Sequence, residues 1–178
     1  MQIELRKLQQ ELGITTVVVT HDQTEAMTMA DQIVVMGRAR VLQTGTPMEI
    51  YKTPVDRFVA GFIGTSNLLP ARMTGADTVE TCGVTLRVGT NVDRHKPGDE
   101  VLLMTRPEEV FVGHKPTKNS VPGRVTFVRD IGATIEILLD CAGHEVVSVL
   151  TPKDWPEVEI GQQVHVDMPE AACSVLAP

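Results

Sequence analysis

The chain has 178 residues, a net charge of −7 and a hydrophobic content of 42%, which suits one large domain or two small ones. The negative charge and the lack of a basic stripe exclude an electrostatic nucleic-acid surface, so we expect no nucleic-acid partner. Its three cysteines form no Cys-x-x-Cys pair and no apolar run approaches the roughly 20 residues of a membrane span, which argues against a structural zinc site, a disulfide framework and a transmembrane helix.

The first predicted elements are a helix, a strand and a second helix. Residues 2–12 place apolar side chains on one face, which is typical of a surface helix. Residues 14–20 are mostly β-branched and lack polar alternation, which predicts a strand covered on both faces in a parallel sheet. A helix is predicted over 23–30, with Asp22 as its N-cap and Glu25 in the position of a capping box.

His21 lies between this predicted strand and the second helix. In parallel sheets, ligands bind outside the carboxyl ends of the strands, so His21 stands where chemistry is expected. A lone histidine after a strand is nevertheless more often structural than catalytic. Asp22 and Glu25 are better explained by helix capping than by acid–base chemistry at this spacing. The local pattern therefore makes His21 a candidate that needs further support.

A hairpin and two short helices are predicted next. Residues 33–36 and 39–43 are apolar strands joined by a glycine-containing turn. Thr46 and Pro47 begin a helix as its N-cap and its first residue, where the missing proline N–H costs nothing. A further helix is predicted over 56–63, where a glycine follows its last residue.

From residue 65 onward the pattern changes to short β-rich segments. Glycine and proline clusters divide them, as expected for a small barrel of OB type. The charge balance also changes, because residues 1–64 carry 6 basic and 7 acidic side chains, whereas residues 65–178 carry 10 and 16. We therefore predict two domains, 1–64 and 65–178. The predicted strands of the second domain are 68–73, 79–81, 84–88, 100–105, 123–129, 134–140, 145–150 and 163–168.

Several stretches of the chain resemble one known family. Residues 16–36, which run from Thr-Val-Val-Val-Thr-His-Asp-Gln-Thr-Glu-Ala-Met to Asp-Gln-Ile-Val-Val-Met, are similar to the last part of the nucleotide-binding domain of ABC importer ATPases. Residues 43–54 and 57–64 look like that family's connection out of the ATPase core. The resemblance implies an α+β fold, with a short α/β remnant of the ATPase domain over 1–64. A mainly-β, OB-like regulatory barrel, the TOBE domain, would follow over 65–178.

In that family, the histidine at the position of His21 is the switch histidine, which contacts the γ-phosphate of ATP and helps to hold the attacking water in line. An imidazole N–H suits this role because it can donate to a phosphoryl oxygen whose charge grows in the transition state. The chain lacks the Gly-x-x-x-x-Gly-Lys-Ser/Thr loop, the Asp-Glu pair at a strand end and the Leu-Ser-Gly-Gly-Gln signature. We therefore interpret it as the C-terminal part of a longer polypeptide that uses ATP and Mg. We expect the fragment itself to hold no cofactor or metal and to be inactive.

The resemblance implies the ATP-binding subunit of an ABC solute importer, which couples ATP hydrolysis to solute uptake. Its implied partners are a second copy of itself, forming a homodimer, and membrane permease subunits that hold this cytoplasmic protein at the inner face of the cell membrane. Residues 63–70 favour polyamine, iron or phosphonate importers over the maltose type. Two alternatives stay open, a purely structural dimerisation module and a small-molecule module that binds oxyanions. The basic residues available to an oxyanion are Lys115, Lys118, Arg124 and Arg129.

Two further expectations concern less specific patterns. Arg106, Glu108 and Glu109 could line a ligand site, form a structural ion pair or make a subunit contact. The predicted strand 14–20 lacks sheet neighbours in this chain, which would leave its edges unpaired. We therefore predict that residues 1–36 are disordered, or are buried by self-association or strand exchange between chains.

Overall fold

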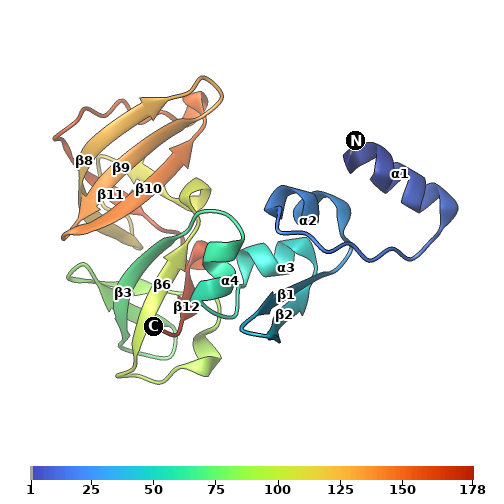
Figure 1. Cartoon of the computed structure of the whole chain (residues 1–178). Coiled ribbons are helices and arrows are strands. Elements are labelled where there is room, and N and C mark those ends of the chain that lie inside the picture. Colours follow the sequence, from blue (N-terminus) through green and yellow to red (C-terminus); the bar gives the residue numbers. More distant parts are fainter. Residues whose placement is uncertain (1) are drawn as a thin grey trace. The chain divides into compact units, whose positions relative to one another are not determined.

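The computed structural model describes residues 2–178 of the chain. Contacts between Cα atoms divide it into two compact units, Met1–Gly64 and Thr65–Pro178. We call them the N-terminal unit and the C-terminal unit and describe each by itself. Figure 1 labels helices and strands of both units where there is room.

Over residues 2–64, the N-terminal unit consists of four short helices and one antiparallel hairpin. The hairpin pairs β1 with β2 and carries an irregularity between Val35 and Met36, where the register shifts. The predicted helices and hairpin are confirmed, with ends that move by at most two residues. The elements are α1 (Gln2–Leu12), α2 (Gln23–Met29), β1 (Ile33–Gly37), β2 (Arg40–Gly45), α3 (Pro47–Lys52) and α4 (Arg57–Phe62).

The strand predicted over 14–20 is wrong. This segment runs between α1 and α2 as extended backbone with no partner strand, and the hairpin is the only sheet among the described residues of the N-terminal unit (Figure 1). Val17 and Val19 are 87% and 95% exposed. A strand requires a neighbour for its N–H and C=O groups, and this unit offers none to residues 14–20. Residues 14–20 have the apolar pattern of a buried strand, but no described strand of this unit pairs with them.

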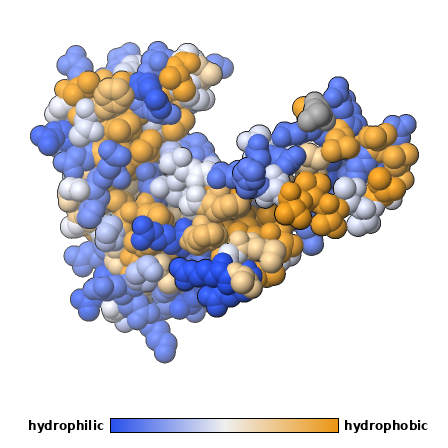
Figure 2. All heavy atoms as spheres, viewed as in Figure 1, coloured by the Kyte–Doolittle hydropathy of each residue, from blue (hydrophilic) through white to orange (hydrophobic). Residues whose placement is uncertain are grey.

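Hydrophobic side chains consequently remain on the surface of α1 and of the segment that follows it. Figure 2 shows them over this part of the chain. The helix α1 has no buried residue, and its Arg6 side chain binds Asp31, which lies between α2 and β1. Arg6 donates from Nη1 to Oδ2 of Asp31 at 3.1 Å and makes a second, shorter contact with the other carboxylate oxygen. This hydrogen bond and ion pair lowers the pKa of the Asp31 carboxyl.

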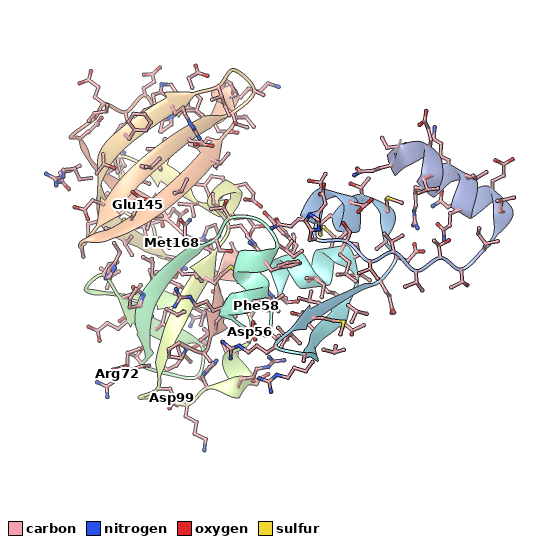
Figure 3. The ribbon with its side chains drawn as sticks, viewed as in Figure 1. Asp56, Phe58, Arg72, Asp99, Glu145 and Met168 are labelled. Atoms are coloured by element: carbon pink, nitrogen blue, oxygen red, sulfur yellow. The ribbon has the colours of Figure 1, made fainter. Side chains whose placement is uncertain are left out.

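The buried core of the N-terminal unit lies between the hairpin, α3 and α4. Ile50 of α3 and Val59 of α4 are fully buried in it. Asp56 caps α4 by accepting a hydrogen bond from the Val59 N–H at 2.9 Å, and Figure 3 shows Asp56 at the start of this helix with Phe58 beside it. The core is small. Its buried members are Ile33, Val35, Ile50, Val59 and Ile63.

The C-terminal unit consists of two five-stranded antiparallel sheets. Their strand orders are β10-β9-β8-β11-β7 and β12-β6-β3-β4-β5. All eight predicted strands are present, and the two missed ones, β7 and β12, are three residues long. The strands are β3 (Asn67–Met73), β4 (Thr78–Thr81), β5 (Val84–Arg87), β6 (Glu100–Thr105), β7 (Phe111–Gly113), β8 (Ser120–Asp130), β9 (Ile135–Cys141), β10 (His144–Leu150), β11 (Gln163–Asp167) and β12 (Ser174–Leu176). Four 3-10 turns connect them, η1 (Val92–Arg94), η2 (Pro107–Glu109), η3 (Pro152–Asp154) and η4 (Glu170–Ala172).

One continuous core fills this unit. Strand β9 alternates buried and half-buried residues along its whole length, so that Ile135, Ile137, Leu139 and Cys141 all face inward. This period of two is what a curled sheet with one covered face requires. The predicted fold class is confirmed in its overall form, a mainly-β, OB-like C-terminal unit preceded by a small unit that contains helices.

Asn67 joins the two sheets where they meet. Its side chain is 4% exposed, and its amide makes both hydrogen bonds that a neighbouring strand would make. Nδ2 donates to the Val147 carbonyl oxygen, and Oδ1 accepts from the Val147 N–H, each at 2.8 Å. Asn67 begins β3 and Val147 lies in the edge strand β10, so a single side chain closes part of this edge.

Candidate functional site at the start of helix α2

His21 lies at a bend between the extended segment and α2, and its side chain is exposed. The backbone is held on both sides of it. The Asp22 N–H donates to Oγ1 of Thr20 at 3.0 Å, and Oδ1 of Asp22 accepts from the Glu25 N–H at 3.1 Å. The predicted N-cap is therefore confirmed. Two local hydrogen bonds thus stabilise the backbone conformation next to His21.

The residue after the cap connects this site to a distant part of the unit. Gln23, the first residue of α2, accepts a hydrogen bond at Oε1 from the Gly64 N–H, at 2.9 Å and across 41 residues of sequence. Gly64 has a φ of +74°, a backbone conformation that glycine adopts readily and other residues rarely do. No local pattern in the sequence indicates this contact.

The chemistry available at this site is that of one exposed imidazole. Such a group can donate a hydrogen bond to a phosphoryl oxygen. Among residues 2–178, no group of three or more histidine, cysteine, aspartate or glutamate side chains lies close enough to hold a metal ion. The sequence also has no phosphate loop. The residues present therefore do not fit ATP or Mg by themselves.

Arg106 lies at the start of the C-terminal unit's turn η2 and is 3% exposed. Its Nη1 donates to the Thr65 carbonyl oxygen at 3.1 Å and to Oγ of Ser66 at 2.6 Å. Glu108 is exposed and Glu109 is half-buried. Of the three roles considered, these contacts favour a structural one for Arg106, because it binds the segment that begins its own unit.

Two of the basic residues considered for oxyanion binding, Arg124 and Arg129, each lie beside a carboxylate. Arg124 faces Asp140 with 3.6 Å between Nη2 and Oδ2, and the Nε of Arg129 donates to Glu136 at 3.0 Å. Both pairs lie across the β8–β9 ladder. Each arginine thus has a carboxylate beside it, which offsets the positive potential that an anion would need.

The three cysteines are free, and two are fully buried. Burial raises the pKa of the Cys141 thiol to about 12, with smaller contributions from Cys82 and Asp140. Burial likewise raises the pKa of Cys173 to about 12, and it raises the pKa of the half-buried Cys82 thiol. Because the thiolate is the reactive form, none of them has the environment of a nucleophile.

The comparisons with known proteins agree with this architecture. The TOBE domain family matches residues 103–176. The "Spermidine/putrescine import ATP-binding protein PotA" of Mesorhizobium japonicum is 46% identical over 154 residues, which are 84% of this chain and 42% of that protein. The "Sulfate/thiosulfate import ATP-binding protein CysA 2" of Chromobacterium violaceum is 44% identical over 139 residues, 76% of this chain and 37% of that protein. The chain thus spans less than half the length of these relatives.

A solved structure supports the fold of the β-rich part. The cytoplasmic molybdate-binding protein ModG superimposes with a TM-score of 0.53 at 16% identity, over 63% of this chain and 96% of that protein. At this identity the likeness concerns the fold alone. Within residues 2–178, no helix has the length and apolar character needed to cross a membrane. The chain is similar over most of its length to the C-terminal, TOBE-containing part of ABC importer ATP-binding subunits.

Proposed function

We propose that this chain acts as the C-terminal part of an ATP-binding subunit that couples ATP hydrolysis to solute uptake through an ABC importer. The similarity to import ATP-binding proteins over most of the chain carries the proposal. Residues 1–64 would contribute the last part of the ATPase core, and residues 65–178 would regulate the subunit and hold two copies together. ATP and Mg would be bound by other parts of the complete ATPase core.

Within this proposal, His21 is the switch histidine. Its exposed side chain and the fixed backbone on both sides of it support the role. The imidazole would donate to a γ-phosphate oxygen as negative charge develops there, and catalysis of phosphoryl transfer rests mostly on such positioning and electrostatics. This is the only catalytic role that we assign within the chain.

The test is a His21→Ala substitution in a full-length ATP-binding subunit that contains this chain. We expect kcat for ATP hydrolysis to fall by about 100-fold or more, with little change in KM, because the lost contact stabilises the transition state. His144→Ala is the matched control, since His144 is an exposed histidine in the C-terminal unit. An unchanged kcat in His21→Ala would reject the role. The 178-residue chain alone should show no ATP binding by calorimetry.

The partners and the location follow from the same proposal. A permease in the membrane would bind the complete subunit at the inner face of the membrane, and a second copy of the chain would complete the dimer. Relatives named for spermidine/putrescine and for sulfate/thiosulfate are similarly close, so the polyamine, iron or phosphonate preference remains a proposal. Transport assays with spermidine, ferric iron and a phosphonate would separate these solutes.

A further inference from the structure

The strand arrangement of the C-terminal unit occurs twice. The sequence Asn-x-x-Pro-x-Arg lies at the start of both β3 and β8, and its arginine is Arg72 in the first case and Arg124 in the second. Each arginine lies opposite an acidic residue of the next strand, Arg72 opposite Glu80 and Arg124 opposite Asp140. In each sheet, the strand that carries the motif lies between the strand that follows it and a later one, β4 and β6 for β3, β9 and β11 for β8. The two sheets are thus two repeats of one strand plan.

The second repeat has a longer hairpin than the first. Seven residues separate Arg72 from Glu80, whereas fifteen separate Arg124 from Asp140. The added length forms the outer part of the β8–β9 hairpin, residues 126–138, which we call the extension (Figure 1). The first sheet has the same strand order without such an extension, so the strand order does not depend on it.

One edge of the extension has no strand beside it in the described part of the chain. Strand β11 pairs with β8 only as far as Arg124. The next residue, Val125, accepts a hydrogen bond from the Gly161 N–H and donates one to the Gln162 carbonyl oxygen. The chain can turn away from β8 there, because Gly161 has a φ of +89°. Beyond this point β8 continues to Asp130 with β9 as its only described neighbour.

The hydrogen-bonding groups on this edge follow from the register of the hairpin. The Ile131 N–H donates to the Thr134 carbonyl oxygen at 3.0 Å, so these two residues form a hydrogen-bonded pair. Hydrogen-bonded and non-hydrogen-bonded pairs alternate along an antiparallel ladder. Val128 and Asp130 therefore belong to non-hydrogen-bonded pairs, and their backbone N–H and C=O groups point away from β9, towards the open edge.

Exposed apolar side chains accompany this edge. Phe127 is 49% exposed and Ile131 is 56% exposed. Ile160, which precedes the glycine where the contact with β8 ends, is 65% exposed. Val128 instead packs against the core, so its neighbours Phe127 and Arg129 lie on the outer face. An open strand edge with apolar neighbours is a template for pairing with another strand.

We propose that the extension is the surface through which two copies of this chain associate, with β8 of one copy antiparallel to β8 of the other about a twofold axis at Val128. Such an axis makes the edge self-complementary. The N–H and C=O of Val128 meet the same groups of the second copy, and Phe127 lies opposite the second copy's Arg129. Asp130 lies opposite Thr126, so no like charges face each other.

The charges on this edge favour a second copy over a charged peptide as the occupant. The Nε of Arg129 donates to Glu136 of its own hairpin at 3.0 Å, so the edge carries a balanced pair, and a guanidinium suits an aromatic ring opposite it. In the same alignment, Ile131 reaches the place where β11 ends and meets the second copy's Ile160. The pairing names a surface for the proposed role of residues 65–178 in holding two copies together, and its biological meaning rests on that proposed function.

Disulfide crosslinking of two mixed variants tests the register. Phe127 and the second copy's Arg129 form a non-hydrogen-bonded pair in this arrangement, with Cα atoms about 4.5 Å apart, a separation that a disulfide can span. We expect an equal mixture of Phe127→Cys and Arg129→Cys chains to give a covalent dimer after oxidation with oxidised glutathione. Each variant alone is the matched control and should give much less, because position 127 faces position 129 and not itself.

Sedimentation measures the association itself. Phe127→Lys should raise the dissociation constant of the dimer about tenfold or more, because it removes the apolar contact and places a second positive charge opposite Arg129. Phe111→Lys is the matched control, since Phe111 is 45% exposed on β7 of the same unit, and it should leave the constant within about twofold. Near-UV circular dichroism checks that each variant is folded.

A mixture that gives no more covalent dimer than the single variants would overturn this pairing, as would a Phe127→Lys chain that associates like the unmodified one. A chain that stays monomeric at all concentrations would also overturn it. So would a dimer that Val17→Thr/Val19→Thr dissociates and Phe127→Lys does not, because the contact would then lie in segment 14–20. If crosslinking fails while His21→Ala still lowers kcat in the full-length subunit, the proposed function stands and this inference falls.

Discussion

At the scale of single residues, Asn67 shows how one side chain can replace part of a strand. Its amide satisfies both the N–H and the C=O of Val147. Asn67→Ala should destabilise the C-terminal unit by about 2–4 kcal/mol, because it leaves two backbone groups without a protein partner. Asn67→Asp should also destabilise it, since a carboxylate accepts from the Val147 N–H but repels the neighbouring carbonyl. Guanidinium unfolding followed by Trp155 fluorescence measures both effects.

Gln163→Ala is the control for Asn67, because Gln163 is an exposed polar residue on β11 of the same unit. It should change the free energy of unfolding by no more than about 0.5 kcal/mol. If Asn67→Ala were as harmless as this control, the two hydrogen bonds to Val147 would contribute nothing to the closure of the sheets.

The buried thiols predict how stability depends on pH. Their ordinary pKa is 9.0, and burial raises the pKa of Cys141 and Cys173 to about 12 in the folded chain. Unfolding exposes both thiols, so the unfolded chain releases their protons at a lower pH than the folded chain does. Their contribution to stability is therefore complete below about pH 9 and is lost as the pH rises towards 12. Urea unfolding at pH 8, 9, 10 and 11 should show this decline.

A Cys141→Ala/Cys173→Ala double variant tests the cause of that decline. It is less stable at pH 8, because two buried side chains become smaller. Between pH 9 and 11, however, it should lose less stability than the unmodified chain. An equal loss in both proteins would assign the decline to other groups, such as the lysines.

Residue-scale features could be predicted from the sequence where they are local. The predicted caps Asp22 and Thr46 each bind an N–H three residues ahead, and their residue types are enough to identify them. The contacts of Gln23 and Asn67 span 41 and 80 residues. Their partners depend on the tertiary fold, and no spacing in the sequence indicates them.

At the scale of elements, helices depend mainly on local contacts, whereas strands depend on neighbours that are distant in the sequence. The helix α1 forms as predicted although it buries no residue, because a helix satisfies most of its hydrogen bonds within itself. The segment 14–20 has the composition of a strand but requires neighbours that this chain does not supply. Strands β7 and β12 were not predicted because of their length. They have three residues each, too few for a period of two to be recognised.

The exposure of segment 14–20 predicts a mild response to polar substitution. Val17→Thr/Val19→Thr should leave the free energy of unfolding within about 0.5 kcal/mol of the unmodified chain. Val35→Thr is the matched comparison in the same unit, because Val35 is 2% exposed, and it should lower the free energy of unfolding by about 1–3 kcal/mol.

Sedimentation of the Val17→Thr/Val19→Thr variant then measures self-association. If valines 17 and 19 mediate strand exchange between chains, their substitution should weaken any dimer that forms.

At the scale of the whole molecule, the two units differ in how much core they possess. The C-terminal unit has one continuous core contributed by both of its sheets, whereas the hydrophobic cluster described in the N-terminal unit has only a few buried members. Because stability follows buried apolar area, the C-terminal unit should be the more stable of the two. Its fold matches that of a known protein over most of that protein's length, which is what an independently folding domain would show.

Limited proteolysis of the full chain tests this difference. Thermolysin, which cleaves before apolar residues, should cut first within residues 14–20, where the backbone is extended and Val17 and Val19 are exposed. A product that contains residues 67–176 should persist after the N-terminal unit has been degraded. Mass spectrometry identifies the sites, and sedimentation under the same conditions gives the oligomeric state. A monomer that resists cleavage throughout residues 1–36 would contradict the prediction. A dimer protected there would instead indicate that a second copy covers the segment.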